Sequence, residues 1–322
     1  WNSTPLQADY TWFTIGEKTF SIGVLLNNLT VLMQFIVCII ALPVHIYSKS
    51  YMKGDAGLHR YWMYLSLFCF AMLGLTISKN LLMMYIFWEL VGFASYLLIG
   101  FWFTKESAVL ANKKAIVINR IGGLGFLIGL AILLSTFGTL DLVEILGKDG
   151  LFFQGIIDTN SGLISAAGIC FFLGAMAKSA QFPLHLWLPD AMEGPTSVSS
   201  LIHAATMVAA GVFLLSSIFP LFNGTVLLII TIIGTITAIT SAIFALAQYD
   251  IKKVLAFSTI SQLGYMIVAV GISAWDAGMF HLSTHAFFKC LLFLSAGAVI
   301  HEMANLKAHN NLDFDPQDLR NM

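Results

Sequence analysis

The chain has 322 residues, of which 58% are hydrophobic and only 10% are charged, and its mean hydropathy is +0.85. A soluble domain carries about 25% charged residues, so this composition indicates a protein that lies within a lipid bilayer. The formal net charge of −1 gives no electrostatic basis for a nucleic-acid partner. The four cysteines stand singly in apolar runs, which favours packing roles over a metal or redox site.

Nine apolar segments are long enough to cross a membrane, since a transmembrane helix needs about 20 residues. Their apolar runs are continuous, whereas the strands of a β-barrel would alternate in polarity over roughly 10 residues. The sequence therefore predicts an all-α polytopic membrane protein with spans at about 22–45, 60–78, 81–103, 114–136, 161–182, 197–219, 223–247, 253–273 and 277–300. The charged stretch 137–160, which includes Asp141 and Asp158, is expected to be a solvent-exposed loop.

The basic residues test this count of spans. If the nine spans alternate in direction, ten of the 16 Lys and Arg residues fall on one side, three on the other and three inside spans. The positive-inside rule then places the ten-charge side in the cytoplasm or the matrix, with Trp1 outside. Because the sequence begins at Trp1 and stops soon after Asp318, we expect it to be an internal fragment of a longer protein.

Two charged residues lie in the third and fourth predicted spans. Charged side chains inside a membrane cost at least about 2.5 kcal/mol each on insertion scales, so they are functional candidates. Glu89 lies near the middle of its span, with Tyr85 and Gly92 on the same helix face. Arg120 lies at the start of the next span, where it either joins a proton relay or extends its side chain to the cytoplasmic surface.

Lys178 is a third candidate, near the end of the fifth predicted span. It lies among small residues, which permit close helix approach or leave room for water. A buried lysine near a carboxylate can gain and lose a proton near neutral pH. The alternative is a static ion pair with Glu89 that only fixes helix packing. Pro183 either breaks this helix inside the membrane, as at ion sites of transporters, or ends it at the membrane surface.

Three ionisable residues recur at intervals of four in the last predicted span. His281, His285 and Lys289 therefore share one helix face. Histidine is the side chain best suited to proton relay near neutral pH. His203, one turn inside the sixth span, is either a hydrogen-bonded packing residue or part of the same relay. A metal site is disfavoured, because no cysteine or carboxylate lies at ligand spacing on that face.

Several long motifs resemble the antiporter-like L subunit of proton-pumping NADH:quinone oxidoreductase (respiratory complex I), which is subunit 5 in mitochondria. They are WELVG at 88–92, AKSAQFP at 177–183, HAATMV at 203–208, DIKKVLAFST at 250–259 and THAFFK at 284–289. The resemblance runs from about residue 20 to residue 308. It implies an antiporter-like fold of inverted five-helix repeats, each with a broken helix. By that pattern the chain comprises a segment 1–59 with one lead-in transmembrane helix, a first repeat 60–219 and a truncated second repeat 220–322 of three helices.

The same resemblance implies roles for the charged residues. Glu89 and Lys178 match the Glu–Lys pair of the proton pump, and His203 matches the histidine beyond it. His281, His285 and Lys289 match the central hydrophilic axis of the family.

The resemblance also implies cofactors, partners and a location. NADH, FMN, the iron–sulfur clusters and quinone would bind other subunits, and this chain carries no cysteine pattern for a cluster. Its partners would be the other membrane subunits of complex I, including neighbouring antiporter-like subunits, within a lipid bilayer. The expected location is the bacterial cell (inner) membrane, ahead of the mitochondrial inner membrane or the thylakoid membrane.

One position departs from the family pattern. Three residues after Arg120 the family usually places an aspartate, regarded as a proton-entry partner, and this chain has Gly123. A glycine there resembles the large subunit of multisubunit Na⁺/H⁺ antiporters, which is the alternative interpretation. The stretches 193–195 (EGP) and 287–289 (FFK) favour the L subunit. A partner in dissolved CO₂ or bicarbonate uptake has the same fold, but it would need a soluble zinc-bearing companion.

Overall fold

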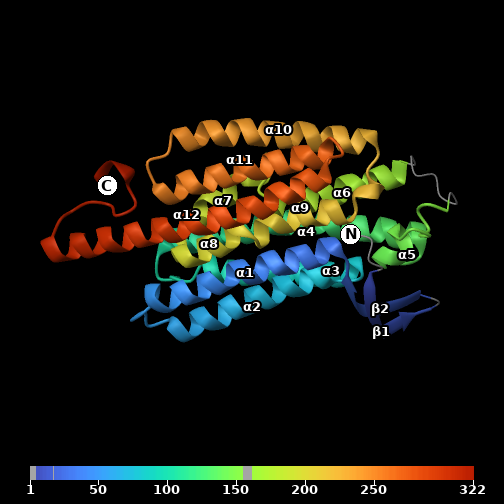
Figure 1. The fold of residues 1–322 in the computed structure, drawn as a ribbon, viewed down its shortest axis with the longest axis horizontal. Coiled ribbons are helices and arrows are strands. Elements are labelled where there is room, and N and C mark those ends of the chain that lie inside the picture. The colour runs from blue at the N-terminus through green and yellow to red at the C-terminus, as the bar shows by residue number, and fades with distance from the viewer. Residues whose placement is uncertain (1–4, 17, 155–161) are drawn as a thin grey trace.

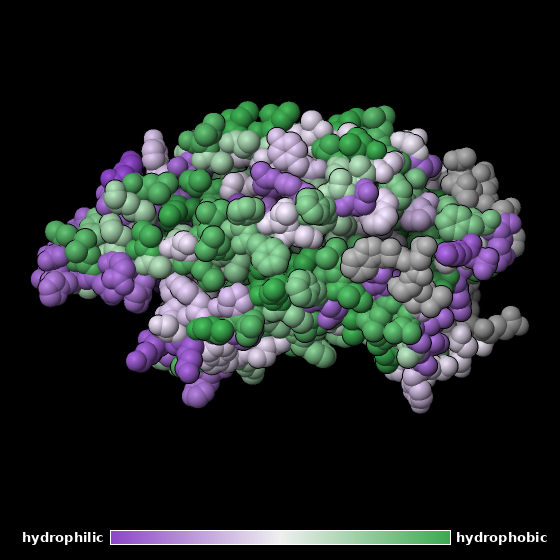
Figure 2. Space-filling view, viewed as in Figure 1, coloured by the Kyte–Doolittle hydropathy of each residue, from purple (hydrophilic) through white to green (hydrophobic). Residues whose placement is uncertain are grey.

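The computed structural model describes residues 5–16, 18–154 and 162–322. Its long helices run side by side in an elongated bundle, with a β-hairpin at one end and the C-terminus at the other (Figure 1). In the described part, eight helices are long and apolar enough to cross a membrane. Figure 2 shows hydrophobic side chains over the middle of the bundle and hydrophilic ones gathered at its two ends. The predicted polytopic helical membrane fold is confirmed.

The seven longest helices are α1 (Asn28–Tyr51), α2 (Leu58–Ile77), α3 (Leu81–Ile99), α4 (Glu106–Phe137), α10 (Gly224–Leu246), α11 (Ile251–Gly271) and α12 (Trp275–Asn310). The shorter ones are α5 (Leu142–Leu146), α6 (Gly162–Lys178), η1 (Leu184–Leu186), α7 (Trp187–Asp190), η2 (Ala191–Glu193), α8 (Thr196–Ala204), α9 (Met207–Ser217), η3 (Phe219–Leu221) and η4 (Leu319–Asn321). Asn or Asp side chains cap several of the helices by accepting first-turn backbone N–H groups, at Asn27, Asn80, Asp141, Asn223 and Asp250.

A β-hairpin that was not predicted from the sequence precedes α1. Strand β1 (Leu6–Ile15) pairs antiparallel with β2 (Lys18–Leu26), and β2 takes up residues expected in the first span. The predicted start of that span at 22 was therefore wrong. The physical reason is Asn27, whose side chain accepts the backbone N–H of Thr30 at 2.9 Å and fixes the helix start after it.

The stretch 137–160 is not simply a solvent-exposed loop. It contains α5, and Asp141 at the start of α5 is 7% exposed. Lys79 Nζ lies 3.1 Å from a carboxylate oxygen of Asp9 and 3.1 Å from one of Asp141, so it joins the hairpin to α5. Asp158 lies outside the described residues.

The fifth predicted span breaks inside the protein. Helix α6 ends at Lys178, and the residues that follow it, Ser179 to Gln181, are fully buried. The Trp187 indole N–H donates to the backbone carbonyl of Ala177 at 2.9 Å. Non-helical backbone at membrane depth is tolerated only where protein or water satisfies its polar groups. The structure thus favours the internal break over an end of the span at the membrane surface.

The sixth predicted span is confirmed as Thr196–Ser217, one of the eight candidate spans in the described part, but its helix is interrupted inside the bundle. Helices α8 and α9 meet at Ala205 and Thr206, and both helices are almost wholly buried in the bundle. The Thr206 hydroxyl donates to the backbone carbonyl of Leu201 at 2.7 Å, which satisfies a carbonyl near the break. Helix α12 runs ten residues past the predicted end at 300, and Figure 1 shows it extending beyond the bundle. The boundaries of the two repeats stay a prediction.

Candidate functional site

Glu89 on α3 and Arg120 on α4 form a salt bridge. The Glu89 side chain is 19% exposed and that of Arg120 is 54% exposed. Because α4 begins at Glu106, Arg120 lies near the middle of its helix and not at the start as predicted. The ion pair holds the guanidinium beside α3, which contradicts the interpretation that Arg120 extends to the membrane surface.

Two glycines make room for the charged groups of this site. A Cβ atom at Gly123 would collide with Oε1 of Glu89. A Cβ atom at Gly92 would lie 2.6 Å from Nζ of Lys178, which is closer than real Cβ contacts come. The position that departs from the family pattern therefore faces the Glu89 carboxylate directly.

Lys178 is the last residue of α6 and is 2% exposed. Its Nζ lies 5.7 Å from the centre of the Trp88 ring, within cation–π range. Within the described ranges Lys178 forms no salt bridge or hydrogen bond, although the charge of Glu89 acts on it electrostatically. The static contact pair of Glu89 with Lys178, which the sequence left open, is absent there, because the carboxylate contacts Arg120.

His203 on α8 is fully buried. Both of its ring nitrogens lack a hydrogen-bond partner among the described residues, and its ring packs 4.9 Å from that of Phe293. The interpretation as a hydrogen-bonded packing residue therefore has no support in the described part of the chain. The charged groups that act on His203 include Lys289 and His285 of α12.

Two of the three residues predicted to share one face of α12, His281 and Lys289, contact α11. His281 Nε2 lies 2.8 Å from Oε1 of Gln262, and Lys289 Nζ donates to Oγ of Ser258 at 2.6 Å. The rings of His281 and His285 are stacked 6.4 Å apart, and Nε2 of His285 has no described partner. The predicted shared face is confirmed.

Lys252 was not predicted as a site residue, because it falls between two predicted spans among the ten basic residues of one side. Lys252 is 3% exposed, and its Nζ donates to the backbone carbonyls of Met192 and Gly194, the latter at 3.0 Å. Asp250 offered a signal, because a helix cap there places Lys252 in the first turn of α11. Nothing in the sequence separated Lys252 from Lys253, which is partly exposed.

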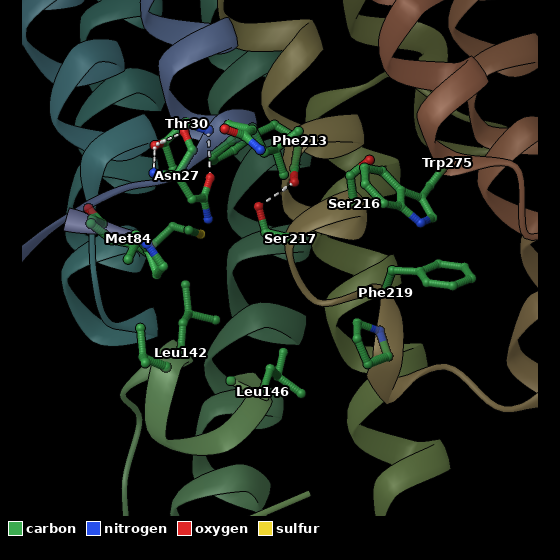
Figure 3. A pocket seen from close by; sticks show the side chains of 18 residues that line it. Asn27, Thr30, Met84, Leu142, Leu146, Phe213, Ser216, Ser217, Phe219 and Trp275 are labelled. Carbon is green, nitrogen blue, oxygen red and sulfur yellow. Dashed lines mark hydrogen bonds between the residues drawn. The ribbon is translucent and has the colours of Figure 1, made fainter. Parts of the chain in front are cut away.

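A cavity of about 410 Å³ lies near the hairpin end of the bundle, apart from these charges. Figure 3 shows that its wall includes Met84, Phe213 and Trp275, from three different helices. The Ser217 hydroxyl donates to the Phe213 carbonyl at 2.8 Å. No residue that lines the cavity is ionisable. The cavity is therefore not part of the charged site.

Two family models match the chain. One, described as NADH:quinone oxidoreductase/Mrp antiporter, TM, matches residues 78–314. The other, described as NADH-ubiquinone oxidoreductase (complex I), chain 5 N-terminus, matches residues 12–62.

Curated relatives agree with these matches. NAD(P)H-quinone oxidoreductase chain 5 of Synechocystis is 50% identical over 100% of this chain and 48% of its own length. NAD(P)H-quinone oxidoreductase subunit 5 of Marchantia polymorpha, a chloroplast protein, is 50% identical over 97% of this chain and 45% of its own. The chain thus spans about half the length of the curated relatives that it matches.

Solved structures share the fold. A chain of the Mrp complex from Dietzia superposes with a TM-score of 0.85 at 30% identity, covering 93% of this chain and 32% of that one. A chain of the membrane-bound sulfane sulfur reductase, an archaeal respiratory membrane complex, has a TM-score of 0.76 at 23% identity over 86% of this chain and 57% of its own. The second likeness supports the fold alone. The chain belongs to the antiporter-like family of membrane subunits that NADH:quinone oxidoreductases share with Mrp antiporters.

Proposed function

We propose that this chain is part of the proton-translocating subunit 5 of an NAD(P)H:quinone oxidoreductase. The observation that carries the proposal is Lys178, an ammonium group buried at a helix break with no contacting counter-ion among the described residues. A charge in such a place is costly, so it is retained where its proton is used. The relatives named as chain or subunit 5 support the choice of complex.

The proposed route follows the buried ionisable residues across the bundle. Protons enter from the cytoplasmic side toward Glu89 and Lys178, pass His203 and reach Lys289, and leave on the outer side. Both ring nitrogens of His203 lack a partner among the described residues, and Lys289 acts on the ring, so His203 can take a proton on one nitrogen and release it from the other. No described hydrogen bond joins Lys178 to His203, so water must complete that step.

The driving reaction would occur in other subunits. NADH oxidation and quinone reduction, with FMN and iron–sulfur clusters, are proposed to lie outside this chain, which would contact neighbouring antiporter-like membrane subunits. Because the relatives come from a cyanobacterium and from chloroplasts, a thylakoid membrane is proposed equally with the bacterial cell membrane as the location.

The test is Lys178→Ala in the full-length protein within its complex. In membrane vesicles, we expect normal assembly and a loss of most proton uptake per quinone reduced. Lys148→Ala is the matched control, because Lys148 is exposed and lies near α5. Unchanged proton uptake in an assembled Lys178→Ala complex would refute the proposal.

A second candidate is the large subunit of a multisubunit Na⁺/H⁺ antiporter. The likeness to the Mrp complex and the glycine at Gly123 favour it. That protein would exchange protons for Na⁺ without NADH, so Na⁺-dependent proton movement in vesicles that lack an electron donor distinguishes the two candidates.

A further inference from the structure

The Glu89 carboxylate has two cations within reach and contacts only one of them. It forms a salt bridge with Arg120, while Lys178 acts on it without contact. We propose that Gly123 is a positioning residue, whose missing side chain leaves the space in which Glu89 rests on Arg120 and away from Lys178. This inference deepens the proposed function and rests on it where proton transfer is concerned.

The space on the Arg120 side exists only because residue 123 is glycine. Gly123 follows Arg120 by three residues on α4, so both lie on the same helix face. A Cβ atom at Gly123 would collide with Oε1 of Glu89 and lie 3.3 Å from its Cδ. Any larger side chain would therefore take the place of the carboxylate.

Helix α4 cannot relieve this crowding by moving away from α3. Its glycines pack closely on α6, so its backbone is held on both sides. A Cβ atom at Gly125 would lie 2.9 Å from the backbone carbonyl oxygen of Cys170, and one at Gly122 would lie 3.2 Å from that of Leu173. The side chain of Glu89 must move instead, since backbone shifts in a packed interior cost more than a rotamer change.

The Lys178 ammonium lies beside α3, one turn along from Glu89. Gly92 follows Glu89 by three residues, and Nζ of Lys178 fills the space that its missing side chain leaves. That ammonium forms no described salt bridge, so it would attract a carboxylate displaced from Arg120. A carboxylate displaced from Arg120 by a side chain at position 123 would therefore move toward Lys178 beside Gly92.

The absence of the family's usual aspartate at position 123 therefore affects where the Glu89 carboxylate lies. An aspartate at position 123 would bring a second carboxylate into the space that Glu89 occupies, where two like charges repel. With Gly123, the single carboxylate rests on Arg120. While it rests on Arg120, Lys178 has no contacting counter-ion in the described ranges, which favours release of its proton.

The first test is the structure of the full-length complex with Gly123→Ala, determined by cryo-electron microscopy. We expect the Glu89 carboxylate to leave Arg120 and to form a salt bridge with Lys178. Gly224→Ala is the matched control, because a Cβ atom at the start of α10 meets nothing within 4 Å. A carboxylate that remains on Arg120 in Gly123→Ala would overturn the inference. This readout does not depend on proton pumping, so it decides the inference even if the proposed function fails.

The second test is the pH profile of proton uptake in vesicles. A contacting carboxylate stabilises the protonated lysine, so Gly123→Ala should shift the profile upward by about one pH unit or more. Adding Glu89→Asp, one methylene shorter, should relieve the crowding and bring the profile back toward the wild type. If Gly123→Ala fails to assemble, recovery of assembly by Glu89→Asp supports the inference. Failure of Glu89→Asp to restore either the profile or assembly overturns it.

Discussion

The Lys252 ammonium donates a hydrogen bond to the backbone carbonyl of Gly194 at 3.0 Å, across the boundary between the two predicted repeats. A second bond reaches the carbonyl of Met192, so one buried cation holds the chain between η2 and α8. These carbonyls fall where the backbone leaves one helix and enters another. Without the lysine they would lack a partner at a place that water reaches poorly.

Lys252→Met should therefore destabilise the protein. It leaves two backbone carbonyls unsatisfied, each at a cost of about 1–3 kcal/mol, and the melting temperature of the purified protein should fall. Lys253→Met is the control, because its side chain is partly exposed and forms no described salt bridge. Equal melting temperatures for the two variants would contradict the structural role of Lys252.

The helix break after Lys178 depends on α10. The backbone N–H of Phe182 donates to the Thr237 hydroxyl at 3.0 Å. Thr237→Val keeps the shape of the side chain but removes the acceptor, so we expect a loss of about 1–3 kcal/mol in the free energy of unfolding. Thr235→Val is the matched control, since that hydroxyl is exposed and bonds only within α10. The result would go against this role if the two substitutions lowered the melting temperature equally.

The sequence was informative where a signal repeats within one element. Continuous apolar runs revealed the long helices, and the spacing of four placed His281, His285 and Lys289 on one face, as the structure confirms. The N-terminal hairpin was not predicted, because the apolar end of β2 was assigned to the first span although Asn27 and Asn28 separate it from the apolar run of α1.

Contacts between side chains on different helices could not be predicted from the sequence. Spacing along one helix cannot tell whether Glu89 contacts Arg120 or Lys178, because each lies on a different helix and the choice depends on how the helices rotate. Glu89 contacts Arg120 because there is space for its carboxylate beside Gly123, and that space is seen only when α3 and α4 are packed together.

Lys79 ties the hairpin to the bundle, and Lys79→Met should release it. The substitution leaves the buried Asp141 without its counter-ion, at a cost on the order of 3 kcal/mol. Hydrogen exchange of the amides in β2 should then become faster, while Lys148→Met, at an exposed site near α5, should leave it unchanged. Unaltered exchange in Lys79→Met would show that other contacts hold the hairpin.

The same contact predicts a dependence on pH. Burial alone would lower the pKa of Lys79, but the hydrogen bonds and charges of Asp9 and Asp141 outweigh it and raise the pKa above its ordinary value. A raised pKa in the folded state stabilises the protein at pH values below about 10.4, the ordinary pKa of lysine. This contribution is lost as the pH rises through the raised value. Proteolysis of the hairpin should therefore accelerate at strongly alkaline pH in the wild type, and Lys79→Met should remove that dependence.

Ser258 should affect proton transfer through Lys289, in the outer part of the proposed route. Its hydroxyl accepts a hydrogen bond from Lys289 Nζ at 2.6 Å, and hydrogen bonds to charged groups contribute about 1.5–3 kcal/mol. Ser258→Ala should leave the ammonium with the Leu255 carbonyl at 3.1 Å as its other described acceptor, and so reduce proton uptake per quinone several-fold. Ser283→Ala is the control, because that hydroxyl bonds to the Met279 carbonyl within α12. If both variants pump like the wild type, proton translocation does not depend on the hydrogen bond between Lys289 and Ser258.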